Sequence, residues 1–218
     1  MQGTTKHVFW EALLITIVVF IAGMLIGVSF EGNRLDKIED YYTISEISMM
    51  DILALNNILA MNNLSCENLA IANADFADRI YEEARLLEKY EGAGKVSNDL
   101  KLAHKKYDLM RTFLWVNSIK TFERCGEDYN VVVYLYEYDT EELSQKAIQN
   151  VWSKVLFDLK QEVGSSIVLI PIAADADLAS LGTLLRDFEI EQYPVVIINN
   201  EHMVDKLSST EDLKKYLD

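Results

Sequence analysis

The segment Ile190–Asn200, which reads IEQYPVVIINN, predicts how the last part of this chain folds. One proline is followed by four β-branched residues, a composition that favours a strand. Proline lacks the N–H that a central strand position needs, so Pro194 is expected at the first position of that strand. The pair Asn199-Asn200 then predicts a hairpin turn into a second strand over His202–Leu207.

The segments on either side of this strand predict a regular order of elements. Leu184, Leu185 and Phe188 have helical spacing before it, and Ser208–Asp212 is typical of the cap of a last helix, Leu213–Leu217. Further upstream the sequence predicts a strand over Val131–Tyr138, a helix over Glu141–Val163 and a strand over Ser166–Ala173.

The order of helix, proline-initiated strand, hairpin, strand and capped helix resembles the C-terminal half of the thioredoxin fold. The resemblance covers roughly the last two-fifths of the chain. It implies a thioredoxin-like α/β domain over residues 127–218 and a cis peptide bond before Pro194. In that family the groove beside the cis-proline takes an extended peptide by backbone pairing, and the groove candidates here are Tyr136, Tyr138, Thr140, Tyr193 and Pro194.

The resemblance also implies where redox chemistry would take place. In redox-active members a C-x-x-C motif opens the helix after the first strand, where the helix N-terminus lowers the thiol pKa. The corresponding segment, Tyr136–Ser144, contains no cysteine. Thr140 is the counterpart of the first cysteine of the C-x-x-C motif. We therefore expect a redox-inactive member. Because His7, His104 and His202 do not accompany a nucleophile in any triad order, no catalytic residue is assigned.

The segment Val8–Phe30 contains a single charged residue, Glu11, at its edge. The run that follows is about the twenty residues needed to cross a bilayer, so residues 1–31 are predicted to be a short tail and a signal-anchor helix. A cleaved signal peptide is the alternative, although its apolar region is usually shorter. Gly23 and Gly27 form a G-x-x-x-G pattern, which lets two membrane helices approach closely. A homodimer formed through this helix is therefore an alternative.

Residues 32–126 contain three sets of apolar residues at helical spacing, separated in part by the glycine-rich segment Glu91–Lys95. The apolar stripes are wide, which favours an intrachain bundle of three helices over a coiled coil. An elongated stalk remains an alternative. The predicted fold class is therefore α+β, with a transmembrane helix, an all-α helical bundle or hairpin and a C-terminal thioredoxin-like domain.

Cys66 and Cys125, the two cysteines of the chain, lie about equally far from that glycine turn. An antiparallel hairpin folded there brings them to the same end, which predicts a disulfide. Disulfides persist outside the cytosol, so we expect a cytoplasmic N-terminus and extracytoplasmic soluble domains. Asn63 lies in the N-glycosylation sequon Asn63-Leu64-Ser65. An exchangeable Cys66–Cys125 pair working with a separate redox partner is the alternative.

The formal net charge of −15 argues against a nucleic-acid partner, whose phosphates would be repelled. Asp175, Asp177 and Asp187 are interpreted as loop and cap residues, since Asp175-Ala176-Asp177 lacks the rest of a calcium loop. No metal or other cofactor is predicted. The predicted function is a single-pass membrane protein that binds an unidentified protein or peptide. The alternatives are a thiol-disulfide oxidoreductase and a structural subunit of a membrane complex.

Overall fold

The computed structural model of this chain describes residues 4–60, 65–91, 98–125 and 130–217. The chain divides into two compact units, residues 1–41 and residues 42–218. The described residues are mostly helical and contain one four-stranded sheet. The prediction of a mixed α+β class is therefore confirmed.

The first unit consists of the beginning of helix α1, Thr4–Ala60. Within it Val8–Phe30 has a mean hydropathy of 2.7 and is not buried by any other part of the structure, so this helix is long and apolar enough to cross a membrane. The helix does not end where the apolar run ends, because it continues through Gly32. A lone glycine costs a helix interior only about 1 kcal/mol relative to alanine.

The helical part of the second unit contains the remainder of α1 together with α2, Cys66–Glu91, and α3, Asn98–Cys125. Ser65 caps α2, since its hydroxyl accepts a hydrogen bond from the N–H of Asn68 at 3.4 Å. Cys66 and Cys125 form a disulfide with their Cα atoms 5.6 Å apart. The predicted pairing at one end of an antiparallel α2–α3 hairpin is confirmed.

The sheet has the order β2-β1-β3-β4. Strands β1, Asn130–Tyr136, and β2, Ile167–Ala173, are parallel, with Asn130 opposite Ile167 and Tyr136 opposite Ala173. Strands β3, Val195–Ile198, and β4, His202–Val204, continue the sheet in antiparallel pairs. Pro171 lies in the edge strand β2, where a missing N–H is tolerated.

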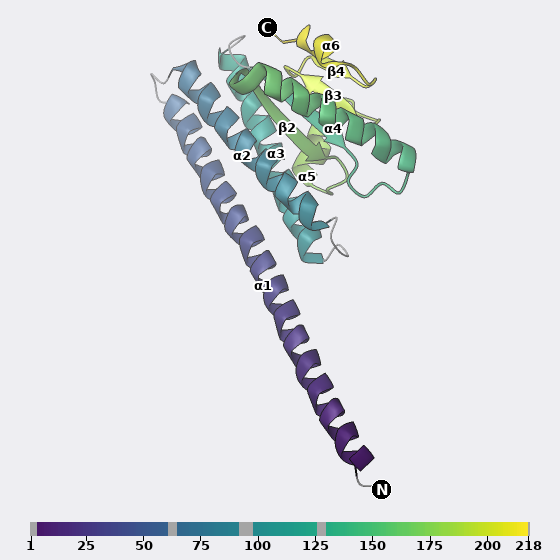
Figure 1. Cartoon of the computed structure of the whole chain (residues 1–218). Helices are drawn as coiled ribbons and strands as arrows, with labels where there is room; N and C mark the ends of the chain where they lie inside the picture. The colour runs from purple at the N-terminus through teal and green to yellow at the C-terminus, as the bar shows by residue number, and fades with distance from the viewer. Residues whose placement is uncertain (1–3, 61–64, 92–97, 126–129, 218) are drawn as a thin grey trace. The chain divides into compact units, whose positions relative to one another are not determined.

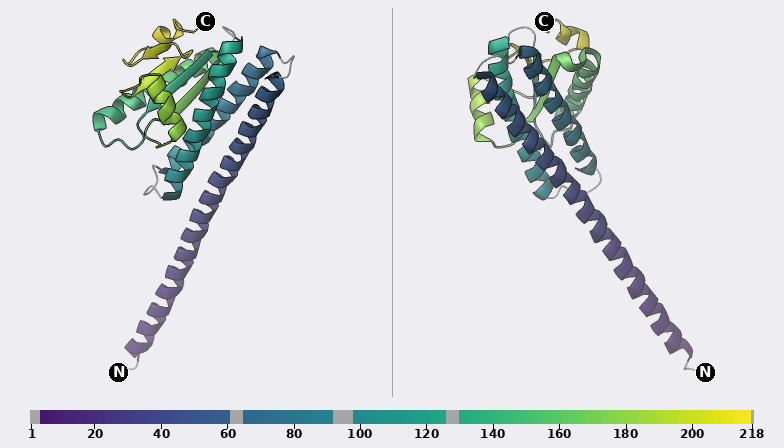
Figure 2. Two further views of the ribbon diagram at one scale, coloured as in Figure 1. Left: turned by 180° about the vertical axis from the view of Figure 1, so that it is seen from behind. Right: turned by 90° about the vertical axis from the view of Figure 1, so that its left-hand side faces the viewer.

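Helices cover both faces of this sheet (Figures 1 and 2). Helix α4, Leu143–Val163, and the short helix α6, Thr210–Lys214, lie on one face, whereas α3 and α5, Ala179–Asp187, lie on the other. A 3-10 turn, η2 (Gly164–Ser166), joins α4 to β2. The core beneath α4 and α6 consists of Val132, Tyr134, Trp152, Leu156, Leu159, Ile167, Leu169, Val196, Ile198 and Leu213.

Element ends differ slightly from the predicted ones. Helix α4 begins at Leu143, because Glu142 is the N-cap and is still extended. The second strand of the hairpin ends at Val204, and the last helix begins at Thr210, where Ser209 accepts a hydrogen bond from the N–H of Asp212. The predicted boundary between residues 126 and 127 lies outside the described residues.

Candidate functional site

The site lies at the carboxyl ends of β1 and β2, which meet at one edge of the sheet because the two strands are parallel. The N–H of Ala174 donates to the carbonyl of Tyr136 at 2.7 Å, so the pairing continues one residue beyond the strands. Ligands commonly bind outside this edge in sheets with parallel strands. The loops after β1 and β2 are therefore the first place to look for binding residues.

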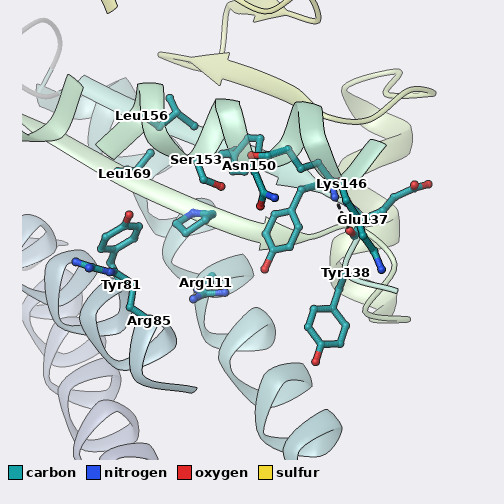
Figure 3. A pocket seen from close by; sticks show the side chains of 14 residues that line it. Tyr81, Arg85, Arg111, Glu137, Tyr138, Lys146, Asn150, Ser153, Leu156 and Leu169 are labelled. Carbon is teal, nitrogen blue, oxygen red and sulfur yellow. Dashed lines mark hydrogen bonds between the residues drawn. The ribbon is translucent and has the colours of Figure 1, made fainter. Parts of the chain in front are cut away.

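A cavity of about 270 Å³ lies between α4, the β1–β2 part of the sheet and helices α2 and α3 (Figure 3). Its volume is close to the lower end of the range of small-molecule pockets, which begins at about 300 Å³. The residues that line it are Tyr81, Arg85, Arg111, Tyr134, Tyr136, Glu137, Tyr138, Lys146, Gln149, Asn150, Ser153, Leu156, Leu169 and Pro171.

Tyrosine rings form much of the wall. The rings of Tyr134 and Tyr136 stack with their centroids 5.5 Å apart, and Tyr81 stacks on Phe157 at 6.3 Å. The Tyr134 hydroxyl donates to the carbonyl of Gln149 at 3.2 Å, and burial raises the pKa of Tyr134 above its ordinary value. This tyrosine is therefore neutral at physiological pH. Stacked rings of this kind offer flat surfaces for an apolar group.

Charged groups in the cavity are mainly cationic. The guanidinium carbon of Arg85 lies 5.3 Å from the centre of the Phe157 ring, and its Nη1 lies 3.4 Å from Glu82. Arg111 Nη1 donates to Asp108 Oδ1 at 3.0 Å, with both side chains buried. Since a lone buried charge is costly, this pairing is what lets Arg111 remain beneath the cavity.

The carboxylate of Asp108 makes two further contacts. Oδ1 also accepts from the N–H of Ala173 at 3.1 Å, and Oδ2 lies 3.2 Å from Nδ1 of His104. The His104 ring packs on Tyr138 with centroids 4.1 Å apart. Asp108 thus joins helix α3 to the end of β2 directly, and its neighbour His104 packs on the loop after β1.

Asp175 holds the loop after β1 in place. Its two carboxylate oxygens accept from the N–H groups of Tyr138 and Asp139, each at 2.8 Å. A second, smaller cavity of about 150 Å³ lies here, with Lys101, His104 and Asp175 among its lining residues. Within the described residues there is no group of three or more histidine, cysteine, aspartate or glutamate side chains placed to hold a metal ion.

Two glutamines of α4 bind the backbone of the loops. The Gln149 amide accepts from the Glu137 N–H at 2.7 Å and donates to the Glu137 carbonyl at 3.0 Å. Gln145 Nε2 donates to the carbonyl of Tyr193 at 2.6 Å. The carbonyl beside Pro194 is therefore already paired within the chain.

The structure places the predicted groove residues in two groups. Tyr136 and Tyr138 line the large cavity, whereas Thr140, Tyr193 and Pro194 are not among its described lining residues. The Tyr193–Pro194 bond is cis. The pKa of Tyr193 is raised by partial burial and by the negative charges of Glu137 and Asp175. Thr140 Oγ1 accepts from the Glu142 N–H at 3.4 Å.

The other predicted sites lie away from the cavity. Cys66 and Cys125 are joined at the end of the α2–α3 hairpin. Gly23 and Gly27 lie in α1, and a Cβ at either position would meet nothing within 4 Å. Asn63 lies outside the described residues.

Sequence reasoning missed the cations and amides of the cavity. Arg85, Arg111 and Lys146 lie on three different helices, and no short motif connects them. One signal was present, because Arg111 is the single charge in the stretch Leu109–Val116 of α3. A charge inside an apolar helical stretch indicates a buried partner, which here is Asp108.

Comparisons with known proteins give little further information. No protein-family model and no curated protein matches the chain. One solved structure, described as "Structure of a malarial protein", is 22% identical over 41% of this chain and 99% of its own, with a TM-score of 0.32. A likeness at that TM-score supports no conclusion on fold or function.

Proposed function

We propose that this chain is a single-pass membrane protein whose thioredoxin-like domain is redox-inactive and binds an extended segment of a protein partner outside the cytoplasm. Support for the fold comes from the order β1, α4, β2, α5, β3, β4, α6, with β1 and β2 parallel and β3 and β4 antiparallel. The proline-initiated strand, the hairpin and the capped last helix follow in the order that the resemblance implies.

The observation that carries the function is the chemistry of the large cavity. It lies where the loop after β1 leads into α4, and its described lining residues include neither cysteine nor histidine. The two cysteines of the chain are paired with each other at the far end of α3. A cavity with tyrosine walls, amides and cations, and without a thiol, favours binding over thiol exchange.

The pairing of Gln145 refines how a partner segment would bind. Strand addition beside Tyr193 would use the carbonyl that already accepts from Gln145 Nε2, so a partner N–H would have to share or replace that hydrogen bond. A partner that binds over Tyr136 and Tyr138 would not disturb the Gln145–Tyr193 hydrogen bond, because both tyrosines line the open cavity. We therefore place the partner segment over these two tyrosines.

The proposed topology rests on the membrane helix and the disulfide together. Val8–Phe30 is apolar enough to anchor the chain, and a Cys66–Cys125 bond would be reduced in most cytosolic compartments. With the residues before Val8 in the cytoplasm, residues 42–218 would lie outside it.

A thiol-trapping experiment tests this proposal. Native membranes are treated with an alkylating reagent before lysis, with and without reductant, and the state of Cys66 and Cys125 is read by mass. We expect both thiols to be blocked until strong reductant is added. Two free thiols would place residues 42–218 in the cytosol, and a pair opened by mild reductant would favour the oxidoreductase.

Assembly through the membrane helix is a second candidate role. Gly23 and Gly27 lie one turn apart in α1, and neither has a neighbour within 4 Å of its Cβ position in this chain. That open surface suits a second copy of the helix. Unchanged crosslinking of the double variant Gly23→Ile and Gly27→Ile in membranes would exclude this role.

A further inference from the structure

The charge of the large cavity is opposite to that of the whole chain. The chain contains 20 Lys and Arg against 35 Asp and Glu. The described residues that line the cavity, in contrast, include Arg85, Arg111 and Lys146 and one acidic residue, Glu137. Glu82 and Asp108 pair with the two arginines but are not among the described lining residues, so the wall that a ligand would meet has more cations than anions. Such an arrangement in an acidic protein favours an anionic ligand.

The cations are distributed along the cavity (Figure 3). Tyr81 and Arg85 lie at one end, Lys146 and Glu137 lie at the other, and Arg111 lies between them. The side chains come from α2, α4 and α3 respectively. This elongated arrangement suits a ligand that carries more than one negative group along its length.

Two of these cations are held in fixed positions. Asp108 holds the guanidinium of Arg111, whose side chain is only 3% exposed. The Phe157 ring supports the guanidinium of Arg85. Preorganised guanidinium groups bind carboxylates well, since less side-chain entropy is lost on binding. Lys146 is exposed and forms no ion pair with any described residue.

Uncharged groups complete the surface. Asn150 and Ser153 extend from α4 on the same side as the cavity, and amide and hydroxyl groups can donate to a carboxylate. The stacked rings of Tyr134 and Tyr136 form an apolar wall beside them. The lining therefore combines donors for an anion with a flat surface for an apolar side chain.

We propose that the cavity binds a partner segment that contains aspartate or glutamate side chains next to an aromatic or aliphatic residue. The proposal rests on the function proposed above and specifies its partner. Recognition of acidic segments by grouped cations is a recurring binding mode. The net negative charge of the chain opposes such a partner at long range, but this repulsion is screened beyond about 8 Å at physiological ionic strength.

The test uses the full chain in lipid nanodiscs and a synthetic library of random hexapeptides, acetylated and amidated at their ends. Retained peptides are identified by mass spectrometry. We expect enrichment of Asp and Glu beside an aromatic or aliphatic residue, and depletion of Lys and Arg. The best retained sequence is then compared with its counterpart in which Asp and Glu are replaced by Asn and Gln, and we expect that counterpart to bind about tenfold more weakly.

Matched variants locate the binding. The double variant Arg85→Gln and Lys146→Gln removes two exposed cations of the cavity and leaves the buried Arg111 in place. We expect it to bind the retained acidic peptide at least about tenfold more weakly. Lys154→Gln removes an exposed lysine of the same helix that does not line the cavity, and we expect an affinity within about twofold of the original.

The outcomes separate this inference from the proposed function. The retained peptides could lack acidic enrichment, and their binding could survive the Arg85 and Lys146 changes but be lost in Tyr136→Ala. That result would overturn the inference of an acidic partner and support the proposed binding function. Retention of no peptide at all would overturn both. If Lys154→Gln lowers the affinity for acidic peptides as much as the Arg85 and Lys146 double variant does, the inference is also overturned, because general surface charge would then explain the binding.

Discussion

The carboxylate of Asp108 on α3 accepts a hydrogen bond at 3.1 Å from the N–H of Ala173, the last residue of β2 and 65 residues away in sequence. The same oxygen accepts from Arg111 at 3.0 Å. The group that positions a cation beneath the cavity is therefore also the group that fixes the helix to the sheet. Stability and the proposed ligand recognition therefore depend on one buried carboxylate.

Replacement of Asp108 by asparagine should be strongly destabilising. The substitution leaves the buried Arg111 charge without its partner, which typically costs about 3–5 kcal/mol. The free energy of unfolding can be measured by urea titration of the solubilised chain, with fluorescence of the buried Trp115 and Trp152 as the signal.

A double-mutant cycle provides the control for Asp108. The double variant Asp108→Asn with Arg111→Met leaves neither charge of the pair buried. We therefore expect its free energy of unfolding to fall by less than the sum of the losses in the two single variants. Strict additivity would show that the ion pair contributes no coupling energy.

Asp175 should matter more than its neighbour Asp177. Asp175→Ala removes the acceptor of the Tyr138 and Asp139 N–H groups, which should cost about 1–2 kcal/mol at this exposed position. Asp177→Asn should change the free energy of unfolding by less than about 0.5 kcal/mol, because Asp177 has a φ of 50° that asparagine also tolerates. Equal effects in urea unfolding would contradict the assigned role of Asp175.

The two asparagines of the β3–β4 turn should differ when each is replaced by glycine. Both have positive φ, 52° at Asn199 and 59° at Asn200, and glycine retains that conformation. Asn199→Gly also removes the acceptor of the buried Val131 N–H and the donor to Asn130, a loss of about 2–3 kcal/mol. Asn200→Gly removes only the acceptor of Trp115 Nε1, a loss of about 1 kcal/mol. Thermal unfolding that ranks them in reverse would refute this assignment.

Loss of the disulfide should destabilise the second unit. Cys66 and Cys125 are 59 residues apart, and in the chain-entropy model such a closure contributes about 4 kcal/mol. Urea unfolding of the double variant Cys66→Ser and Cys125→Ser should show this loss. Reductant should destabilise the original chain by a similar amount and leave the double variant unchanged.

Tyr134 and Tyr193 should ionise at higher pH than an ordinary tyrosine. Burial raises the pKa of Tyr134, and burial with nearby negative charge raises that of Tyr193. Since the folded state favours the neutral phenol, the associated stability is present below the unfolded pKa of about 10 and is lost as pH rises through the folded values. In a near-ultraviolet titration, Tyr134→Phe and Tyr193→Phe should each remove tyrosinate signal that develops above the ordinary pKa of about 10. Removal of an early part would contradict the shifts.

The predictable features of this chain were those with a local cause. The apolar run of Val8–Phe30 determines a helix able to cross a membrane, and β-branched runs determine strands such as Val195–Ile198. The disulfide was predictable because Cys66 and Cys125 lie about equally far from the glycine-rich segment Glu91–Lys95 in the sequence. The thioredoxin-like fold of the C-terminal part stays a prediction.

The cavity could not be predicted, because its parts come together only in three dimensions. Arg85, Arg111 and Lys146 are contributed by different helices. The bond from Gln145 to the Tyr193 carbonyl spans 48 residues. Side chains of this kind carry no periodic signal, since each is set by a partner that is distant in sequence.

If Val8–Phe30 anchors the chain as proposed, the Cys66–Cys125 bond also determines what a protease could detach from the membrane. Both cysteines lie after the anchor and before the sheet, so the bond encloses every residue between them in a covalent ring. A single cut anywhere inside that ring leaves the sheet attached to the anchor. Shedding of the sheet as a soluble fragment would need a cut outside the ring or prior reduction of the bond.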